Sequence, residues 1–213
     1  MSRLLRFLFY RVLVRFVVLI VLGLNVRHRD RFPKKGPAII VANHNSHLDT
    51  MVLMTLIPGQ LLNKTRPVAA MDYFMRNPYL AWFATRIVGI LPINRNRVRS
   101  NEHPLQVCYD AIDEGSVLIF FPEGSRGKPE ELSKFKSGIS VISETYPELP
   151  IIPVLLHGLG KSLPKGEALL VPFFCDVFIG ESMQWTGERK TFMQALDNNM
   201  QQLASEGHFP DWE

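Results

Sequence analysis

The sequence predicts an α/β fold, in which a single domain is built on a mixed, mostly parallel sheet covered by helices. From residue 37 onward, short apolar runs alternate with longer stretches of helical periodicity, which is the pattern of strands joined by helical crossovers. The length of 213 residues suits one such domain with a sizeable core and is short for two full ones. A basic, apolar segment precedes this alternating region and is considered separately.

The expected elements follow one another in the order of the apolar runs and periodic stretches. Strands are predicted near residues 38–42, 67–70, 89–93, 117–121, 151–156 and 173–178, and helices near 46–57, 79–86, 102–114, 137–145 and 190–205. Folds of this class hold their ligands in loops at strand ends. Candidate functional residues are therefore the polar ones that directly follow the apolar runs.

The N-terminal arm, residues 1–34, is predicted to be distinct from a domain formed by residues 35–213. Residues 1–36 carry nine basic groups and one acid, a net +8, whereas the whole chain carries +4, so the remainder is net acidic. A fold that binds nucleic acid usually spreads Lys and Arg over its surface, and no nucleic-acid partner is expected here. Basic groups confined to an apolar arm favour an anionic membrane surface.

Residues 4–24 have the composition of a helix in contact with lipid. Their longest uninterrupted apolar stretch, residues 16–24, has nine residues, whereas a bilayer crossing needs about 20. Four arginines cover about half of the helix circumference and leave the other half for acyl chains: Arg3, Arg6, Arg11 and Arg15. We expect a shallow membrane anchor on the cytoplasmic face. A cleaved signal peptide lacks its small-residue cleavage site here, and a core helix is disfavoured by the four arginines.

The first polar cluster, VANHNSHLDT at residues 41–50, follows the predicted strand 38–42. It has three interpretations: a helix cap, a metal site or a proton-transfer site. As a cap, Ser46 would accept an amide proton from near Asp49, and Asp49 would reach back. A metal site would need ligands beyond His44, His47 and Asp49. No second His or Cys cluster follows, so no metal is expected.

The proton-transfer interpretation requires His44 to precede the helix. Positions five residues apart on a straight helix differ by about 140° around its axis. If His44 lies in the turn and Asp49 in the first helical turn, the carboxylate can orient one imidazole nitrogen and leave the other as a base. Since the chain has no G-x-S-x-G elbow, such a base would activate the hydroxyl of a substrate. Acyl transfer to an alcohol is the resulting hypothesis.

Two further polar clusters follow predicted strands. The first is FPEGSR, residues 121–126, in which Gly124 lets the backbone approach a ligand and Arg126 could bind a phosphate through two hydrogen bonds. The alternative interpretation is a solvated turn that contains a Glu–Arg ion pair. GILPINR, residues 89–95, ends at Arg95, and Arg97 and Arg99 follow. These arginines form either a solvated face or a second phosphate-binding group.

Taken in order, these motifs resemble the glycerolipid acyltransferase family, which includes the 1-acylglycerol-3-phosphate acyltransferases. The resemblance covers residues 36–157 and includes the segment FKSG at 135–138. Its four blocks are N-H-x-x-x-x-D at 43–49, the arginine-bearing block at 89–95, F-P-E-G-T-R at 121–126 with Ser125 in place of Thr, and the apolar-Pro-apolar block at 152–154.

The resemblance implies a role for each matching residue. His44 is expected to be the general base and Asp49 its orienting partner, and the block around Pro153 is expected to belong to the acyl-donor pocket. The residues expected to bind the glycerol phosphate are Arg95, Glu123, Gly124, Ser125 and Arg126. Donors for the oxyanion are expected among the backbone amides at the start of the helix.

The expected reaction moves an acyl group from acyl-CoA or acyl-carrier protein to a lysophospholipid hydroxyl, with 1-acylglycerol 3-phosphate as the favoured acceptor and phosphatidic acid as product. No bound cofactor is expected. The expected partners are membrane lipids and the carrier of the acyl donor. Glycerol 3-phosphate and lyso-aminolipids are alternative acceptors, and a lipid-binding module without catalysis would not need both His44 and Asp49.

Overall fold

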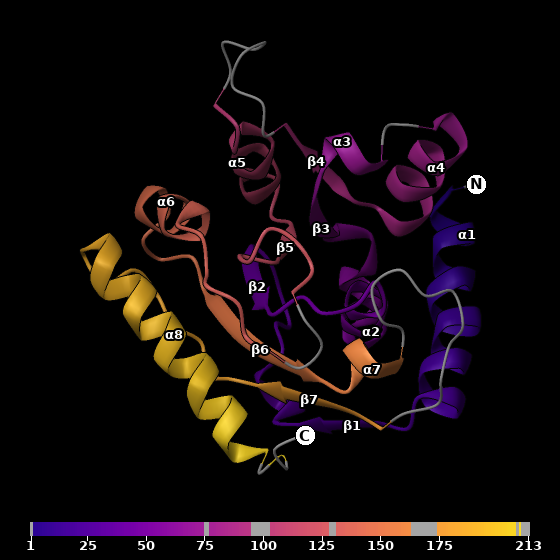
Figure 1. Ribbon diagram of the computed structural model, residues 1–213. Helices are drawn as coiled ribbons and strands as arrows, with labels where there is room; N and C mark the ends of the chain where they lie inside the picture. Colours follow the sequence, from indigo (N-terminus) through magenta and orange to yellow (C-terminus); the bar gives the residue numbers. More distant parts are fainter. Residues whose placement is uncertain are drawn as a thin grey trace.

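The computed structural model contains a seven-stranded sheet between two layers of helices (Figure 1). It describes residues 2–74, 77–94, 103–127, 131–162, 174–207 and 209. The strands are β1 (Leu24–Arg27), β2 (Ala38–Ala42), β3 (Thr65–Ala70), β4 (Leu91–Ile93), β5 (Val117–Phe120), β6 (Ile151–His157) and β7 (Cys175–Ile179). The α-helices are α1 (Ser2–Leu8), α2 (Leu48–Leu56), α3 (Met71–Phe74), α4 (Pro78–Trp82), α5 (Gln106–Asp113), α6 (Gly138–Thr145), α7 (Leu159–Ser162) and α8 (Arg189–Glu206). The π-helical segments are η1 (Phe9–Val14), η2 (Val17–Val21) and η5 (Phe83–Val88), and the 3₁₀ segments are η3 (Arg29–Arg31) and η4 (Gly59–Lys64).

The sheet order is β1-β7-β6-β2-β5-β3-β4, with β2 near the centre. The five strands from β6 to β4 run parallel, β7 runs antiparallel to β6, and β1 runs parallel to β7. The predicted mixed, mostly parallel sheet is therefore confirmed. Val41 of β2 lies opposite both Phe120 of β5 and Pro153 of β6, so these three strands bring their following loops to one edge.

Both faces of the sheet are covered, which explains why its central strands read as continuous apolar runs. All five residues of β2 are buried. Ile39 and Val41 pack into the core shared with α5, α6 and α8, whereas Ile40 packs into the core shared with α2 and the N-terminal helical segment. Figure 1 shows α6 and α8 on one side of the sheet and the N-terminal segment on the other.

The predicted strands and helices from residue 37 onward have observed counterparts within a few residues of their expected ends, and the bounds of β2 agree with those predicted. One strand was missed. β1, Leu24–Arg27, continues directly from the N-terminal segment and pairs with β7 as an edge strand. The residues that the prediction assigned to a separate arm thus include part of the sheet.

The N-terminal helical segment, residues 2–21, packs one face against the domain. Tyr10, Val14, Val18 and Leu22, the residue that caps the segment, are buried at a regular spacing of four residues. Four residues of an α-helix overshoot a full turn by about 40°. The wider π-helical turns of η1 and η2 offset this drift and keep the four positions on one side. This face of the segment therefore behaves as part of a core helix, the alternative that the four arginines had disfavoured.

The opposite face of the N-terminal helical segment is apolar and exposed. Its exposed large side chains are Leu4, Leu5, Phe7, Leu8, Val12, Leu13, Phe16, Leu19 and Ile20, and we call them the apolar stripe. Within the part of the chain that the structure describes, no helix combines the length and apolar character that a membrane crossing requires.

Two of the four arginines on this segment point into the protein, so the expectation that all four reach toward lipid headgroups is wrong for Arg6 and Arg11. Arg6 is 5% exposed and donates a 2.7 Å hydrogen bond to the carbonyl of Thr65. Arg11 donates to the carbonyl of Ile57 at 2.6 Å and to that of Thr55 at 3.3 Å, at the C-terminal end of α2. Guanidinium groups can satisfy the carbonyls that a helix end leaves unbonded.

Candidate active site

His44 lies in the turn between β2 and α2, and Asp49 lies in the first turn of α2. This is the arrangement that the proton-transfer interpretation requires. The Nδ1 atom of His44 is 2.9 Å from Oδ2 of Asp49. The side chain of Asp49 is 1% exposed and that of His44 is 20% exposed, so the acid is sealed inside the protein and the imidazole reaches the surface.

Oδ2 of Asp49 also accepts hydrogen bonds from two backbone amides of the turn, Asn45 N at 2.8 Å and Ser46 N at 2.9 Å. An oxygen that accepts from two amides acts as an acceptor toward His44 as well, so Nδ1 carries the proton. The lone pair of the neutral imidazole is then on Nε2, which is the atom able to take a proton from a ligand.

The capping interpretation is also met in part, because Asp49 reaches back to the amide of Ser46. The Oγ atom of Ser46 accepts from Leu48 N at 3.3 Å. The amides of Asn45, Ser46 and Leu48 are consequently engaged inside the turn. The expectation that amides at the helix start supply the oxyanion donors does not hold for these three.

The loop after β5 holds His44 from both sides of its backbone. Oε1 of Glu123 accepts from His44 N at 3.1 Å, and Gly127 N donates to the carbonyl of His44 at 2.9 Å. The ring of Phe121 stacks on the imidazole with centroids 4.3 Å apart and 25° between planes. The first and third sequence blocks thus meet directly, because β2 and β5 are adjacent parallel strands.

Glu123 is a buried carboxyl group, 4% exposed. Burial raises the pKa of Glu123 to about 7, and the neighbouring Asp49 carboxylate adds to the rise, whereas the hydrogen bond from the His44 amide opposes it. This side chain interacts with the amide of His44 and with Ser133, both groups of the protein itself. The role in substrate binding that the resemblance implies for Glu123 stays a prediction.

Gly124 and Lys136 form the next part of this loop. Gly124 has φ of +74°, and a Cβ atom there would lie 2.7 Å from Nζ of Lys136. Lys136 is anchored by its amide, which donates to the carbonyl of Pro122 at 2.9 Å. The exposed lysine therefore lies against the loop at Gly124, a contact that the sequence motif alone did not indicate.

Ser125 is exposed and Arg126 is partly buried at the end of the same loop. Partial desolvation lowers the pKa of His47, and the positive charge of Arg126 lowers it further. Arg126 therefore acts within electrostatic range of the turn that carries both histidines. The phosphate-binding role expected of Ser125 and Arg126 stays a prediction.

Asn43 fixes the end of β2 to the neighbouring strand, and sequence reasoning gave it no role. Its Nδ2 donates to the carbonyl of Leu156 at 2.8 Å, and its Oδ1 accepts from Leu156 N at 2.7 Å. These two bonds continue the β2–β6 ladder by one side chain just before His44. The sequence signal for this link between β2 and β6 was an asparagine placed between a buried strand and a candidate base.

The remaining predicted residues differ in what the structure says of them. Arg95 lies outside the described residues. Pro153 lies buried in β6, opposite Val41 of β2, and its role toward an acyl donor stays a prediction. Among the residues that the structure describes, no group of three or more His, Cys, Asp or Glu side chains is arranged to hold a metal ion.

Comparison with known proteins points to one family. The family model described as Acyltransferase matches residues 23–157. A chloroplastic 1-acyl-sn-glycerol-3-phosphate acyltransferase of Brassica napus is 33% identical over 131 residues, which cover 62% of this chain and 36% of that protein. The chloroplastic enzyme of the same name from Arabidopsis thaliana is 31% identical over 147 residues, covering 68% and 38%. The chain thus spans little more than a third of the length of these two relatives.

The crystal structure of a 1-acyl-sn-glycerophosphate acyltransferase from Thermotoga maritima has a similar fold, with a TM-score of 0.74. The similarity covers 98% of this chain and 81% of that one at 19% sequence identity, and it supports the fold alone. The family match includes β2, β5 and β6 together with His44, Asp49 and the loop that holds them. The chain therefore belongs to the Acyltransferase family.

Proposed function

We propose that this protein transfers a fatty acyl group from a thioester, acyl-CoA or acyl-carrier protein, to the free hydroxyl of 1-acylglycerol 3-phosphate, giving phosphatidic acid. The observation that carries the proposal is the His44–Asp49 pair, in which a sealed carboxylate orients a surface-reaching imidazole. The similarity to 1-acyl-sn-glycerol-3-phosphate acyltransferases of Brassica napus and Arabidopsis thaliana supports the choice of acceptor.

In the proposed reaction, Nε2 of His44 takes the proton of the acceptor hydroxyl as its oxygen attacks the thioester carbonyl. The tetrahedral intermediate collapses with cleavage of the carbon–sulfur bond, and the thiolate takes the proton back from His44. The products are the new ester and the free thiol, and no metal or bound cofactor enters the proposed scheme. Arg126, whose charge acts on His47, and Lys136, whose side chain lies against Gly124, are proposed to meet the acceptor phosphate.

We further propose that the protein works at the cytoplasmic face of a membrane, with the apolar stripe in contact with acyl chains. The exposed cations Arg3 and Arg15 border this stripe, as an anionic surface requires. Trp82 and Phe83, at the junction of α4 and η5, add exposed aromatic surface, and the ring of Phe83 packs 5.4 Å from that of Phe9. A lipid acceptor and a carrier-bound donor could both reach an enzyme at this interface.

The test of the catalytic proposal is a pair of substitutions three positions apart. Purified protein given acyl-CoA or acyl-carrier protein with 1-acylglycerol 3-phosphate is expected to release thiol and form phosphatidic acid. His44→Ala should abolish both signals because it removes the base, whereas His47→Ala, at the more exposed neighbour, should retain turnover within a few fold. Thermal melts of both variants control for folding. Turnover retained in His44→Ala would refute the assignment of the base.

The acceptor is tested separately with glycerol 3-phosphate and lyso-aminolipids in the same assay. The proposal expects the highest kcat/KM with 1-acylglycerol 3-phosphate. A higher value with an acceptor that lacks phosphate would reassign the substrate and leave the role of His44 unchanged.

A further inference from the structure

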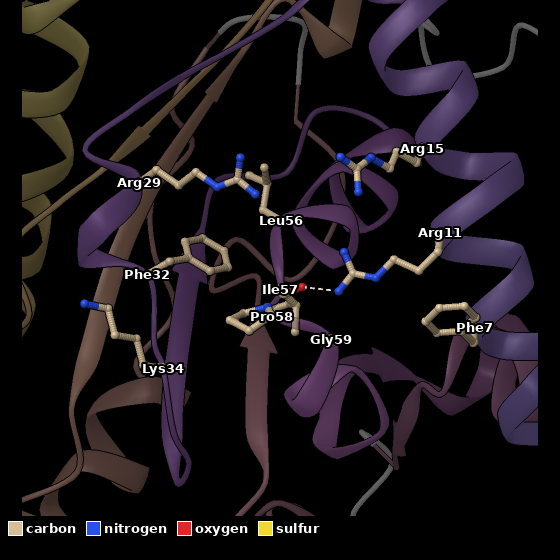
Figure 2. A pocket seen from close by; sticks show the side chains of 10 residues that line it. All are labelled: Phe7, Arg11, Arg15, Arg29, Phe32, Lys34, Leu56, Ile57, Pro58 and Gly59. Carbon is tan, nitrogen blue, oxygen red and sulfur yellow. Dashed lines mark hydrogen bonds between the residues drawn. The ribbon is translucent and has the colours of Figure 1, made fainter.

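A second polar site lies at the far end of α2 from His44. An open cavity of about 580 Å³ is lined by Phe7, Arg11, Arg15, Arg29, Phe32, Lys34, Leu56, Ile57, Pro58 and Gly59. Asp49 lies in the first turn of α2 and Leu56 at its end, which places the two residues about 10 Å apart along the helix axis. The cavity lies between the N-terminal helical segment, the loop before β2 and the end of α2 (Figure 2), and we call it the basic pocket.

The basic pocket is positively charged, and its lining contains no acidic side chain that would neutralise this charge. Four of its ten lining residues are cationic, and none of the ten is acidic. Figure 2 shows the guanidinium groups of Arg15 and Arg29 reaching from opposite sides toward the space over Leu56, while the ammonium group of Lys34 points away. Burial lowers the pKa of Arg11, and the charges of Arg15 and Arg29 lower it further. Such mutual repulsion is relieved when an anion binds between the cations.

One of the cations is fixed before any ligand arrives. The two hydrogen bonds of Arg11 to the carbonyls of Ile57 and Thr55 hold its guanidinium at the pocket wall. Arg15 and Arg29 are exposed and can turn toward a ligand. Guanidinium groups suit phosphate because they offer paired donors in a planar fork.

The apolar part of the lining indicates that the anion belongs to a lipid. Phe7 lines the pocket, is 48% exposed and belongs to the apolar stripe, so the pocket opens next to the surface proposed to contact acyl chains. Leu56, Ile57 and Pro58 supply further apolar wall. A lipid placed here can put its phosphate among the arginines and its chains along Phe7.

We propose that the basic pocket binds the phosphate group of an anionic phospholipid, at a headgroup site separate from the catalytic turn. Such a site would make docking depend on the headgroup present in the membrane. It needs no turnover and uses neither His44 nor Arg126, so it stands or falls independently of the proposed reaction, except that it shares the membrane surface proposed for the apolar stripe.

The test compares two double variants of equal charge. Arg15→Gln with Arg29→Gln removes two pocket cations, and Lys35→Gln with Lys64→Gln removes two exposed cations that lie outside the lining. The probe is flotation with phosphatidylcholine vesicles that contain phosphatidylglycerol, a lipid that is neither acceptor nor product of the proposed reaction. The pocket variant should bind on the order of tenfold more weakly than the wild type, and the control within about threefold. Equal losses in the two variants would show diffuse charge attraction and overturn the pocket.

Two further measurements identify the source of the phosphate. In detergent, native mass spectrometry should show one phosphatidylglycerol retained per wild-type chain and none on the pocket variant. Retention unaffected by the two substitutions would overturn the proposal. Millimolar inorganic phosphate should not displace the lipid. If it does, and raises the Tm of the wild type but not that of the pocket variant, the site binds free phosphate and the lipid assignment is wrong.

Discussion

At the scale of single residues, Asp49 combines two duties in one oxygen atom. Its Oδ2 accepts from His44 Nδ1 and from the amides of Asn45 and Ser46, so the group that orients the imidazole also closes the turn. We therefore expect a change at Asp49 to affect activity and stability together, whereas a change at Ser46 should affect the cap alone.

Asp49→Asn should lower kcat by about 10²–10⁴-fold, because the amide can present a donor to Nδ1 and favour the wrong tautomer. The unfolding free energy should fall by about 1–3 kcal/mol as the buried bonds weaken. Ser46→Ala is the matched control and should lose about 1 kcal/mol with kcat within a few fold. Steady-state kinetics and urea denaturation check both values. Unchanged kcat in Asp49→Asn would contradict the orienting role.

Glu123 predicts a specific dependence of stability on pH. Because its pKa rises from 4.5 to about 7 on folding, the folded protein keeps a proton that the unfolded chain has already lost. The unfolded state then binds fewer protons, so this group lowers stability as pH increases through that window. The effect of the full shift is about 3 kcal/mol, and it is absent below pH 4.5.

Glu123→Gln should remove this dependence while its side-chain oxygen still accepts from His44 N. The variant should therefore gain up to about 3 kcal/mol relative to the wild type between pH 4.5 and pH 8, measured as the difference between their urea unfolding free energies at each pH. Parallel stability profiles for the two proteins would show that the carboxyl group titrates normally.

Gly124 and Gly115 form a matched pair for the loop beside the base. Both have positive φ, +74° and +75°, but a Cβ at Gly124 meets Lys136 whereas one at Gly115 meets nothing within 4 Å. Alanine at either position should cost about 1 kcal/mol of unfolding free energy through backbone strain. Only Gly124→Ala should raise the acceptor KM, because it displaces Lys136. Equal KM values would contradict a role of this lysine near the substrate.

At the scale of elements, the N-terminal helical segment has two apolar faces with different partners. Val18 is 1% exposed and packs into the core, while Ile20, two positions on, is 69% exposed within the apolar stripe. Deleting the whole arm would remove core residues and the edge strand β1, so such a deletion cannot report on membrane binding alone. Single substitutions on the two faces can separate the effect on stability from the effect on membrane binding.

Val18→Ser should lower the unfolding free energy by about 2–4 kcal/mol, since it leaves a cavity and buries a hydroxyl. Ile20→Ser should change stability by less than about 0.5 kcal/mol and weaken binding to anionic vesicles by on the order of tenfold. Denaturation and vesicle flotation separate the two effects. Vesicle binding by Ile20→Ser equal to that of the wild type would count against the apolar stripe as the docking surface.

The arm also shows why sequence reasoning placed it outside the domain. Arginine in an apolar helix indicates contact with lipid headgroups when its charge has no partner within the protein. The amino-acid sequence alone does not identify such a partner. In the structure, the partners of Arg6 and Arg11 are backbone carbonyls of Thr65, Thr55 and Ile57, which lie 44 to 59 residues away. Composition cannot reveal a partner of this kind.

At the scale of the whole molecule, local patterns predicted most of the elements and long-range pairing completed the site. The His44–Asp49 contact was predictable because both residues belong to one strand-to-helix turn. The contact between His44 and Glu123 joins residues 79 positions apart and depends on β5 lying beside β2. Strand order depends on how the two apolar faces of the sheet are covered, and no short motif encodes it.

The N-terminal helical segment carries both core residues and the apolar stripe. This restricts the orientations in which the molecule could bind a bilayer. Tyr10 is fully buried between exposed Phe7 and Leu13, so the proposed lipid-contacting side chains are rigidly connected to the sheet that carries His44. A flexible tether would let the catalytic turn sample many heights above the membrane. A rigid connection allows one height and one tilt, so acceptors would be selected by the depth at which their hydroxyl lies as well as by their chemistry.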